Sequence, residues 1–104
     1  MTMAPTTLFA LLSALRTVRF GTAPTTLNRL SAKGLTSALD AEGSRSTLCT
    51  VERGVRVISV FDEVGVVSLG DGHTWTEALD AALALLEWES REALGAAKVQ
   101  VRVH

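Results

Sequence analysis

Cysteine is nearly absent from the sequence, and long apolar runs are missing altogether. Cys49 is the single cysteine, so the chain cannot form an internal disulfide. This argues against a disulfide-stabilised secreted domain and favours a reducing, cytoplasmic compartment. The longest apolar stretch, residues 78–86, is interrupted by Asp80 and has about half of the ~20 residues that a membrane span needs. We therefore expect no membrane span and no disulfide framework.

Neither sign of charge is in excess over the whole chain. Ten Lys and Arg stand against 11 Asp and Glu, for a net charge of -1, so total charge does not indicate nucleic acid or a membrane surface as the partner. The two halves differ, however. Residues 1–60 hold seven basic and three acidic side chains, and residues 61–104 hold three basic and eight acidic ones. The sequence thus predicts a basic surface in the first half and an acidic one in the second.

Motifs of the common enzyme classes are also missing. The sequence has no phosphate-binding loop, dinucleotide fingerprint, paired metal cysteines or nucleophile elbow, each of which needs fixed residues at fixed spacings. One ionisable cluster remains, and it would join carboxylates to an imidazole if its two turns met at one end of a sheet: Asp62, Glu63, Asp71 and His73. Turns favour the same residue types. We predict no enzyme, no cofactor and no metal site, and keep catalysis around Asp62, Asp71 and His73 as a third hypothesis.

What the chain does contain is enough apolar residues for one folded domain over residues 1–104. They make up 47% of the sequence, against 20% charged residues. Leucines at helical spacing after Pro5 predict a first helix that ends at Gly21. Residues 4–8 return unchanged as residues 23–27, which predicts a second helix start at Pro24. Gly34 inside that second pattern predicts a bend or two short helices.

The apolar period changes to two at Thr47. Residues 47–53, 55–61 and 64–69 are predicted as three antiparallel strands of a meander, followed by a turn at 70–73. Thr74 and Glu77 form a capping box that starts a long amphipathic helix. Its apolar stripe consists of Trp75, Ala78, Leu79, Ala82, Leu85 and Leu86. Alternation over 99–103 predicts a terminal strand, so the expected order is α-α-β-β-β-α-β, an α+β fold with helices on one sheet face.

Residues 47–90 resemble the βββα module of HicB-type antitoxins, which have a partial RNase H-like fold. The similarity lies in the aspartate turn after the second strand (60–65), the third strand ending at Gly70, and the helix start Thr-Trp-Thr-Glu-Ala-Leu at 74–79. Phe61 stands where that family has proline, residues 72–73 look inserted, and no DNA-binding segment follows the helix. The order of elements is also similar to small phage proteins of the ABA-sandwich type. Both resemblances imply a protein of phages or mobile elements, acting in the host cytoplasm if phage-encoded.

The resulting hypothesis is a non-enzymatic protein that binds and blocks another macromolecule. The partner would be a cognate toxin or a nucleic-acid-handling defence complex of the host, inhibited in the manner of an anti-CRISPR protein. Glu77, Asp80 and Glu87 share the side of the helix away from its apolar stripe, and with Asp62 and Glu63 would form an acidic face directed at a basic groove. The terminal strand adds a second expectation, because its apolar face would extend the meander or pair two copies as a homodimer.

The alternative hypothesis is a DNA-binding regulator that uses basic residues of the first half: Arg29, Lys33, Arg45 and Arg53. A helix-turn-helix with Gly34 as its turn glycine fails, because charged residues fall on positions that must pack. A winged helix fits better, with residues 24–33 as recognition helix and residues 35–57 as wing. It lacks one of the usual upstream helices.

Overall fold

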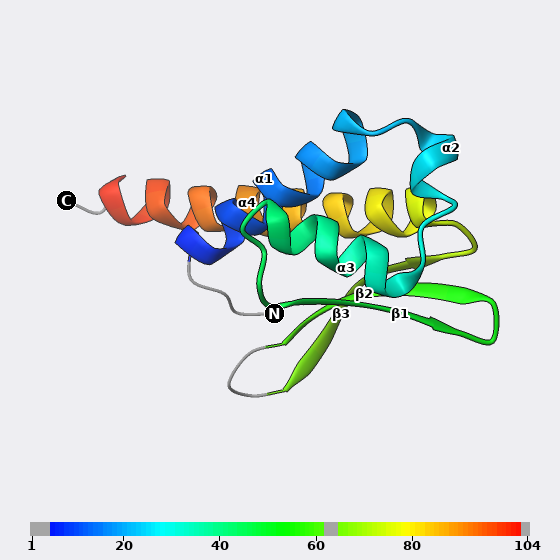
Figure 1. Ribbon diagram of the computed structural model, residues 1–104. Coiled ribbons are helices and arrows are strands. Elements are labelled where there is room, and N and C mark those ends of the chain that lie inside the picture. Colours follow the sequence, from blue (N-terminus) through cyan, green and yellow to red (C-terminus); the bar gives the residue numbers. More distant parts are fainter. Residues whose placement is uncertain (1–4, 62–64, 103–104) are drawn as a thin grey trace.

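The protein is described by a computed structural model that covers residues 5–61 and 65–102. Its elements are α1 (Pro5–Gly21), α2 (Pro24–Leu27), α3 (Ala32–Ala41), β1 (Thr47–Glu52), β2 (Val55–Phe61), β3 (Val66–Gly72) and α4 (Trp75–Arg102). The strands form one antiparallel sheet in the order β1-β2-β3. All helices lie on the same face of this sheet (Figure 1). The predicted α+β class with helices on one sheet face is confirmed.

Two short helices follow α1, which is one of the two outcomes that the sequence predicts, but the break lies at residues 28–31 and Gly34 is inside α3. Pro24 starts α2, where its missing N–H is not needed. Ser31 is the N-cap of α3, and its Oγ accepts a hydrogen bond from the Gly34 N–H at 3.0 Å. α2 ends at Leu27, and the Ser31 cap begins α3. Residues 24–33 are therefore not one helix, and the recognition helix of the winged-helix hypothesis is wrong as placed.

The strands form the predicted meander, with changed boundaries. β1 and β2 are joined by Arg53 and Gly54, which both have positive φ (52° and 79°), the conformation of a tight hairpin turn. β3 starts at Val66 rather than 64 and includes residues 70–72, which the sequence predicted as turn. A register shift between Ile58 and Ser59 gives the β2–β3 pair a bulge.

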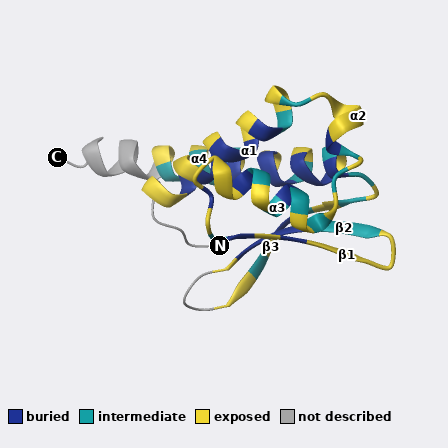
Figure 2. Cartoon of the chain, viewed as in Figure 1, coloured by how far each residue is buried: buried dark blue, intermediate teal, exposed yellow. Residues whose placement is uncertain are grey.

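Three helices form two layers on the inner face of the sheet. α3 packs against β1, α4 packs against β3 and β2, and α1 packs against both α4 and α3. The core includes leucines from these helices and from α2, together with Ile58, Val60, Leu69 and Trp75. The predicted apolar stripe of α4 is buried, apart from the half-buried Leu85, and Leu83 joins it. Figure 2 shows that the buried residues lie where the helices face each other and the sheet.

The capping box at the start of α4 is confirmed in a shifted form. The Glu77 N–H donates to Thr74 Oγ1 at 3.2 Å, and Glu77 Oε2 accepts from the backbone N–H of His73 at 2.9 Å, one residue before the expected Thr74 N–H. The Thr76 N–H donates to the Asn28 side chain at 3.0 Å. The link to Asn28 fixes the α2–α3 connection to the start of α4.

The chain end differs from the expected strand over 99–103. α4 continues to Arg102, and residue 103 lies outside the described residues, so the terminal strand of the predicted order is not confirmed. Helix propagation adds one hydrogen bond for each residue that is ordered, and Gly95 alone does not stop it. No residue beyond Leu86 is fully buried up to Gly95, and α4 projects past the other elements, giving a length of 51 Å (Figure 1).

Candidate functional site

The acidic residues of α4 make contacts within the chain. Asp80 Oδ1 accepts from Arg19 Nε at 2.8 Å and Oδ2 accepts from Arg19 Nη2 at 3.3 Å. Glu87 Oε1 accepts from Arg16 Nη2 at 3.1 Å. Both arginines belong to α1, so α1 lies along the helix side that was expected to face a partner.

The remaining acidic candidates do not complete a common face. Glu77 is engaged in the cap of α4, and Asp62 and Glu63 lie outside the described residues. Arg16 and Glu87 also line an open hollow of about 270 Å³ with Ser90 and Arg91, which mixes both charge signs. The described acidic side chains of α4 are thus mostly used to hold α1 and the start of α4 in place.

These ion pairs lead to a prediction for charge reversal. Asp80→Lys and Glu87→Lys should each lower the free energy of unfolding by up to about 1 kcal/mol, because the two carboxylate side chains are 54% and 39% exposed and water screens the pairs. Glu92→Lys on the same helix, which has no ion-pair partner among the described residues, should change it by less than about 0.5 kcal/mol. Urea unfolding at low and high salt measures this. An equal loss of unfolding free energy in all three variants would show that the two ion pairs do not contribute to stability.

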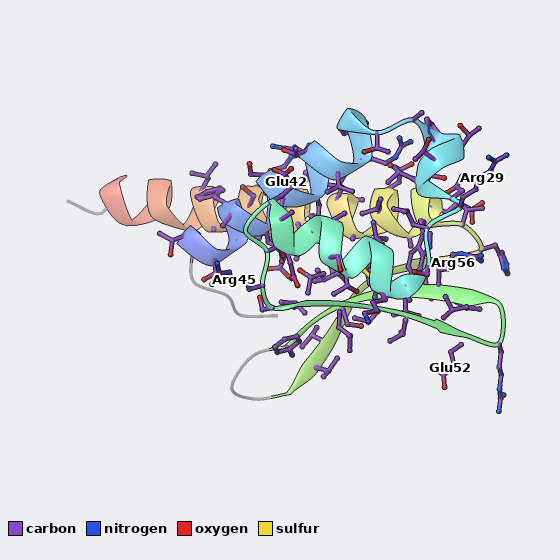
Figure 3. All side chains as sticks on the ribbon, viewed as in Figure 1. Arg29, Glu42, Arg45, Glu52 and Arg56 are labelled. Atoms are coloured by element: carbon purple, nitrogen blue, oxygen red, sulfur yellow. The ribbon has the colours of Figure 1, made fainter. Side chains whose placement is uncertain are left out.

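The basic residues of the alternative hypothesis do not share one face. Arg29 follows α2, and Figure 3 shows it at the same end of the molecule as Arg56 of β2. Arg45 lies at the other end of α3, near Glu42 (Figure 3). Lys33 is in the first turn of α3 and Arg53 is in the β1–β2 turn, and both are exposed. The structure therefore separates Arg45 from the other three candidate DNA contacts, which come from the end of the molecule with α2, the start of α3 and the β1–β2 turn (Figure 1).

The ionisable cluster is divided in a similar way. Asp71 is an exposed residue of β3, and His73 follows that strand, with its carbonyl accepting from Arg56 Nη1 at 2.6 Å. Phe61 and Val66, which flank the segment with Asp62, pair at the opposite end of β3. The expectation that the two turns meet at one end of the meander is wrong, because successive turns of a meander alternate ends. Among the described residues, no group of three or more His, Cys, Asp or Glu side chains is arranged to hold a metal.

Cys49 is a buried residue of β1 beneath α3. Its backbone N–H donates to Thr36 Oγ1 at 3.1 Å. Burial raises the pKa of the Cys49 thiol from 9.0 to about 11; the Thr36 hydroxyl partly offsets this, and the charge of Asp40 adds to it. The thiol is therefore in its unreactive, protonated form at neutral pH.

The raised pKa predicts two measurable properties of Cys49. The thiol should react with a disulfide reagent at least about 100-fold more slowly in the folded than in the urea-unfolded chain. Because the unfolded thiol loses its proton near pH 9 and the folded one only near 11, stability should fall between these pH values, by about 2 kcal/mol. Cys49→Ala should lack this fall. An identical pH profile for Cys49→Ala would contradict the assignment.

The outer sheet face, the side of the sheet away from the helices, is not covered by any described element (Figure 1). Alternation places Leu48 of β1, Phe61 of β2 and Val66 of β3 on it, with exposed fractions of 41%, 45% and 65%. Phe61 and Val66 are directly paired across β2 and β3. Leu48 is paired with Ser59, which lies two residues before Phe61 on β2. Ser59 is only 8% exposed between these neighbours. The result is a contiguous apolar patch at one end of the sheet, with half-buried Val57 beside it.

The charged strand residues on the outer sheet face are both acidic. Glu52 of β1 and Asp71 of β3 are exposed and lie toward the other end of the face. Figure 3 shows Glu52 directed away from the helices. Arg56 is on the inner side, with its guanidinium 5.8 Å from the centre of the Trp75 ring. This face thus combines an apolar patch with an acidic border, and Arg53 in the turn beyond Glu52 is the nearest basic residue of that hairpin.

Sequence reasoning did not identify the outer sheet face. The signal was present in β2, which is apolar on both sides: Val57 and Phe61 alternate with Ile58 and Val60. A strand that is apolar on both sides is typical of a sheet covered on both faces. In this protein the described residues cover only one face of the sheet.

Comparisons with known proteins do not identify a relative. No family model matches the chain, and no curated protein and no solved structure is significantly similar to it. The resemblance of residues 47–90 to HicB-type and phage ABA-sandwich proteins stays a prediction. Within the described ranges, none of the helices combines the length and the apolar character needed to cross a membrane.

Proposed function

We propose that the protein is a non-enzymatic binding protein that covers and blocks a surface of another protein with its outer sheet face. The observation that carries the proposal is the uncovered apolar patch of Leu48, Phe61 and Val66. A cluster of exposed large apolar side chains on a small domain is typical of an interaction site. The hydrogen-bonded strands fix the backbone beneath these side chains, which reduces the entropy lost on binding.

The charge of the face indicates the chemistry of the partner. An apolar patch bordered by Glu52 and Asp71 complements a protein surface with an apolar centre and a basic border. Basic surfaces of this kind are typical of proteins that handle nucleic acid. A toxin or a defence complex that acts on nucleic acid is therefore the class of partner that we propose, and blocking would be steric. The acidic side chains that steer the encounter lie on the sheet, whereas Asp80 and Glu87 of α4 are paired with arginines of α1.

Photo-crosslinking in cells that encode the protein tests the proposal. A benzophenone amino acid is placed at Leu48 or at Phe61, and at Ser37 as a control that is exposed on α3. The two sheet positions should yield the same adduct, and Ser37 should not. The captured protein is then purified, and its affinity for the uncrosslinked chain is measured.

The affinity measurement decides between specific docking and capture alone. Leu48→Lys should weaken binding at least about 10-fold, because replacing an apolar anchor with a charged side chain costs more than ~1.4 kcal/mol of binding free energy. Glu52→Lys with Asp71→Lys should slow association and reduce its salt dependence, whereas Glu42→Lys near Arg45 should not. Equal crosslinking from Ser37, or unchanged affinity of the folded Leu48 variant, would overturn the proposal. A nucleic acid captured in place of a protein would overturn it as well.

A further inference from the structure

The seam between α1 and α4 contains a second candidate site, which lies on the helical side of the molecule. Arg16 of α1 binds Glu87 of α4. Arg19 comes later in α1 but binds Asp80, which comes earlier in α4, so the two helices run antiparallel. α1 packs on α4 and α3, and Figure 1 shows these two helices between α1 and most of the sheet. The seam is therefore separate from the outer sheet face.

An open hollow of about 270 Å³ lies on this seam, and we call it the seam hollow. It is lined by Arg16, Glu87, Ser90 and Arg91. Glu87 neutralises Arg16, to which it is bound at 3.1 Å. Arg91 is exposed, and within the described part of the chain it has no hydrogen bond or ion pair. Ser90 is half-buried beside it, so the seam hollow presents an unpaired cation and a hydroxyl to a ligand.

Exposed apolar side chains flank Arg91 along α4. Trp88 lies three residues before it and Leu94 three residues after it, and residues three apart are neighbours on a helix surface. Their exposed fractions are 55% and 53%. At a rise of 1.5 Å per residue, the two apolar side chains are about 9 Å apart along the helix axis. The unpaired guanidinium therefore lies between two apolar contacts.

The size and charge of the seam hollow indicate which chemical group fits it. Pockets that hold a whole small ligand typically enclose about 300–1,000 Å³, so an open hollow of about 270 Å³ suits a single side chain. Two arginines and one glutamate leave one net positive charge, which one carboxylate balances, whereas Glu87 would repel a dianionic phosphate. A guanidinium also matches a carboxylate in geometry. The apolar flanks favour a carboxylate with apolar neighbours, as in a protein segment.

We propose that the seam hollow is a docking site for an acidic amphipathic helix of a second protein partner. This helix places a glutamate side chain on Arg91. It carries one apolar residue three positions before that glutamate and another three positions after it, because this spacing also spans about 9 Å. The two apolar residues contact Trp88 and Leu94. Tryptophan and arginine are the residue types that most often dominate the binding energy of an interface.

Docking at the seam hollow leaves the outer sheet face open. The chain can then hold two proteins at once, one on its sheet and one on its helices. This inference does not depend on the proposed function, and either of the two can fail alone.

Titration of the full chain with two synthetic peptides tests the site. Both are blocked alanine–glutamine helices with the centre Leu-Ala-Gln-X-Ala-Gln-Leu, where X is Glu in one peptide and Gln in the other. Trp75 is fully buried, so a change of tryptophan emission during the titration reports on Trp88. The Glu peptide should bind with a dissociation constant on the order of 100 μM, because the contact is smaller than a standard interface. The Gln peptide should bind at least about 5-fold more weakly.

Two variants of the site separate its charge from its apolar flanks. Arg91→Gln should weaken binding of the Glu peptide at least about 5-fold and leave the Gln peptide unchanged, so that the two peptides bind alike. Leu94→Ala should weaken both peptides by the same factor, because it removes an apolar contact that both make. If Arg91→Gln is not folded by circular dichroism, Arg91→Ala replaces it.

Two controls lie outside the seam. Arg29 is an exposed arginine beside the start of α4, because the neighbouring Asn28 side chain accepts from the Thr76 N–H. Arg29→Gln should therefore leave the affinity of both peptides unchanged. Leu48→Lys on the outer sheet face should also leave both affinities unchanged, which separates this site from the proposed function.

Four results would overturn the proposal. They are no saturable change of emission up to about 1 mM Glu peptide, equal affinities of the two peptides for the unaltered chain, an unchanged preference for the Glu peptide in Arg91→Gln, and an equal loss of affinity in Arg29→Gln. Sodium phosphate serves as a competitor against sodium chloride of the same ionic strength. Displacement of the Glu peptide by phosphate alone would show a phosphate site and would also overturn the proposal.

Discussion

Gly70→Ala is expected to destabilise the protein by about 3 kcal/mol. A Cβ at this position would lie 2.4 Å from the Ala82 nitrogen and 2.5 Å from the Ala78 carbonyl oxygen. Both are backbone atoms of α4, which cannot move aside by changing a rotamer, so the strand and the helix must separate. Inserting an atom into a packed core typically costs 1–3 kcal/mol and occasionally more. For a domain of this size we expect the midpoint of thermal unfolding to fall by about 10–25 °C.

Gly95→Ala is the matched control, with the opposite expected sign. Gly95 lies in α4, and a Cβ there would have no heavy atom within 4 Å. Alanine should raise the free energy of unfolding by up to about 1 kcal/mol, because glycine is the poorer helix former. Urea unfolding followed by circular dichroism measures both variants. A Gly70→Ala variant as stable as Gly95→Ala would show that β3 and α4 do not approach each other this closely.

The second large effect is expected at Trp75, which joins three segments. The ring is fully buried, its Nε1–H donates to the Leu30 carbonyl at 2.8 Å, and the Arg56 guanidinium lies 5.8 Å from the ring centre. Trp75→Ala should cost about 3–5 kcal/mol, a large part of the 5–15 kcal/mol that typically separates folded from unfolded domains. Trp75→Phe keeps most of the packing but leaves the Leu30 carbonyl without its donor. We expect it to cost about 1–3 kcal/mol.

Trp88→Phe provides the control for Trp75. Trp88 is 55% exposed, so its replacement should change the free energy of unfolding of the monomer by less than about 0.5 kcal/mol. Circular dichroism in urea at low protein concentration is the appropriate measurement, because each variant alters tryptophan fluorescence. If Trp75→Ala and Trp75→Phe were equally stable, the packing of the ring would not contribute as proposed.

Local signals in the sequence determined much of the secondary structure. Pro5 and Gly21 bound α1, and Pro24 and the Ser31 cap start the two short helices that follow it. The bend expected at Gly34 is absent, because Gly34 lies inside α3. β2 has its predicted bounds, and Thr74 with Glu77 marks the start of α4. These features depend on residues within about four positions of each other, so the sequence is sufficient to predict them.

Features that depend on distant residues were decided only by the tertiary structure. Asp80 and Glu87 are 61 and 71 residues from the arginines that bind them, and the same acidic pattern on an isolated helix looks like a free surface. Gly70 looked like a turn residue, but it lies within β3 at a point where α4 leaves no space for a Cβ. The terminal segment alternates like a strand, yet the helix before it propagates through it. Periodicity reports which side of an element is apolar, whereas packing decides what covers that side, and here the described residues leave the outer sheet face uncovered.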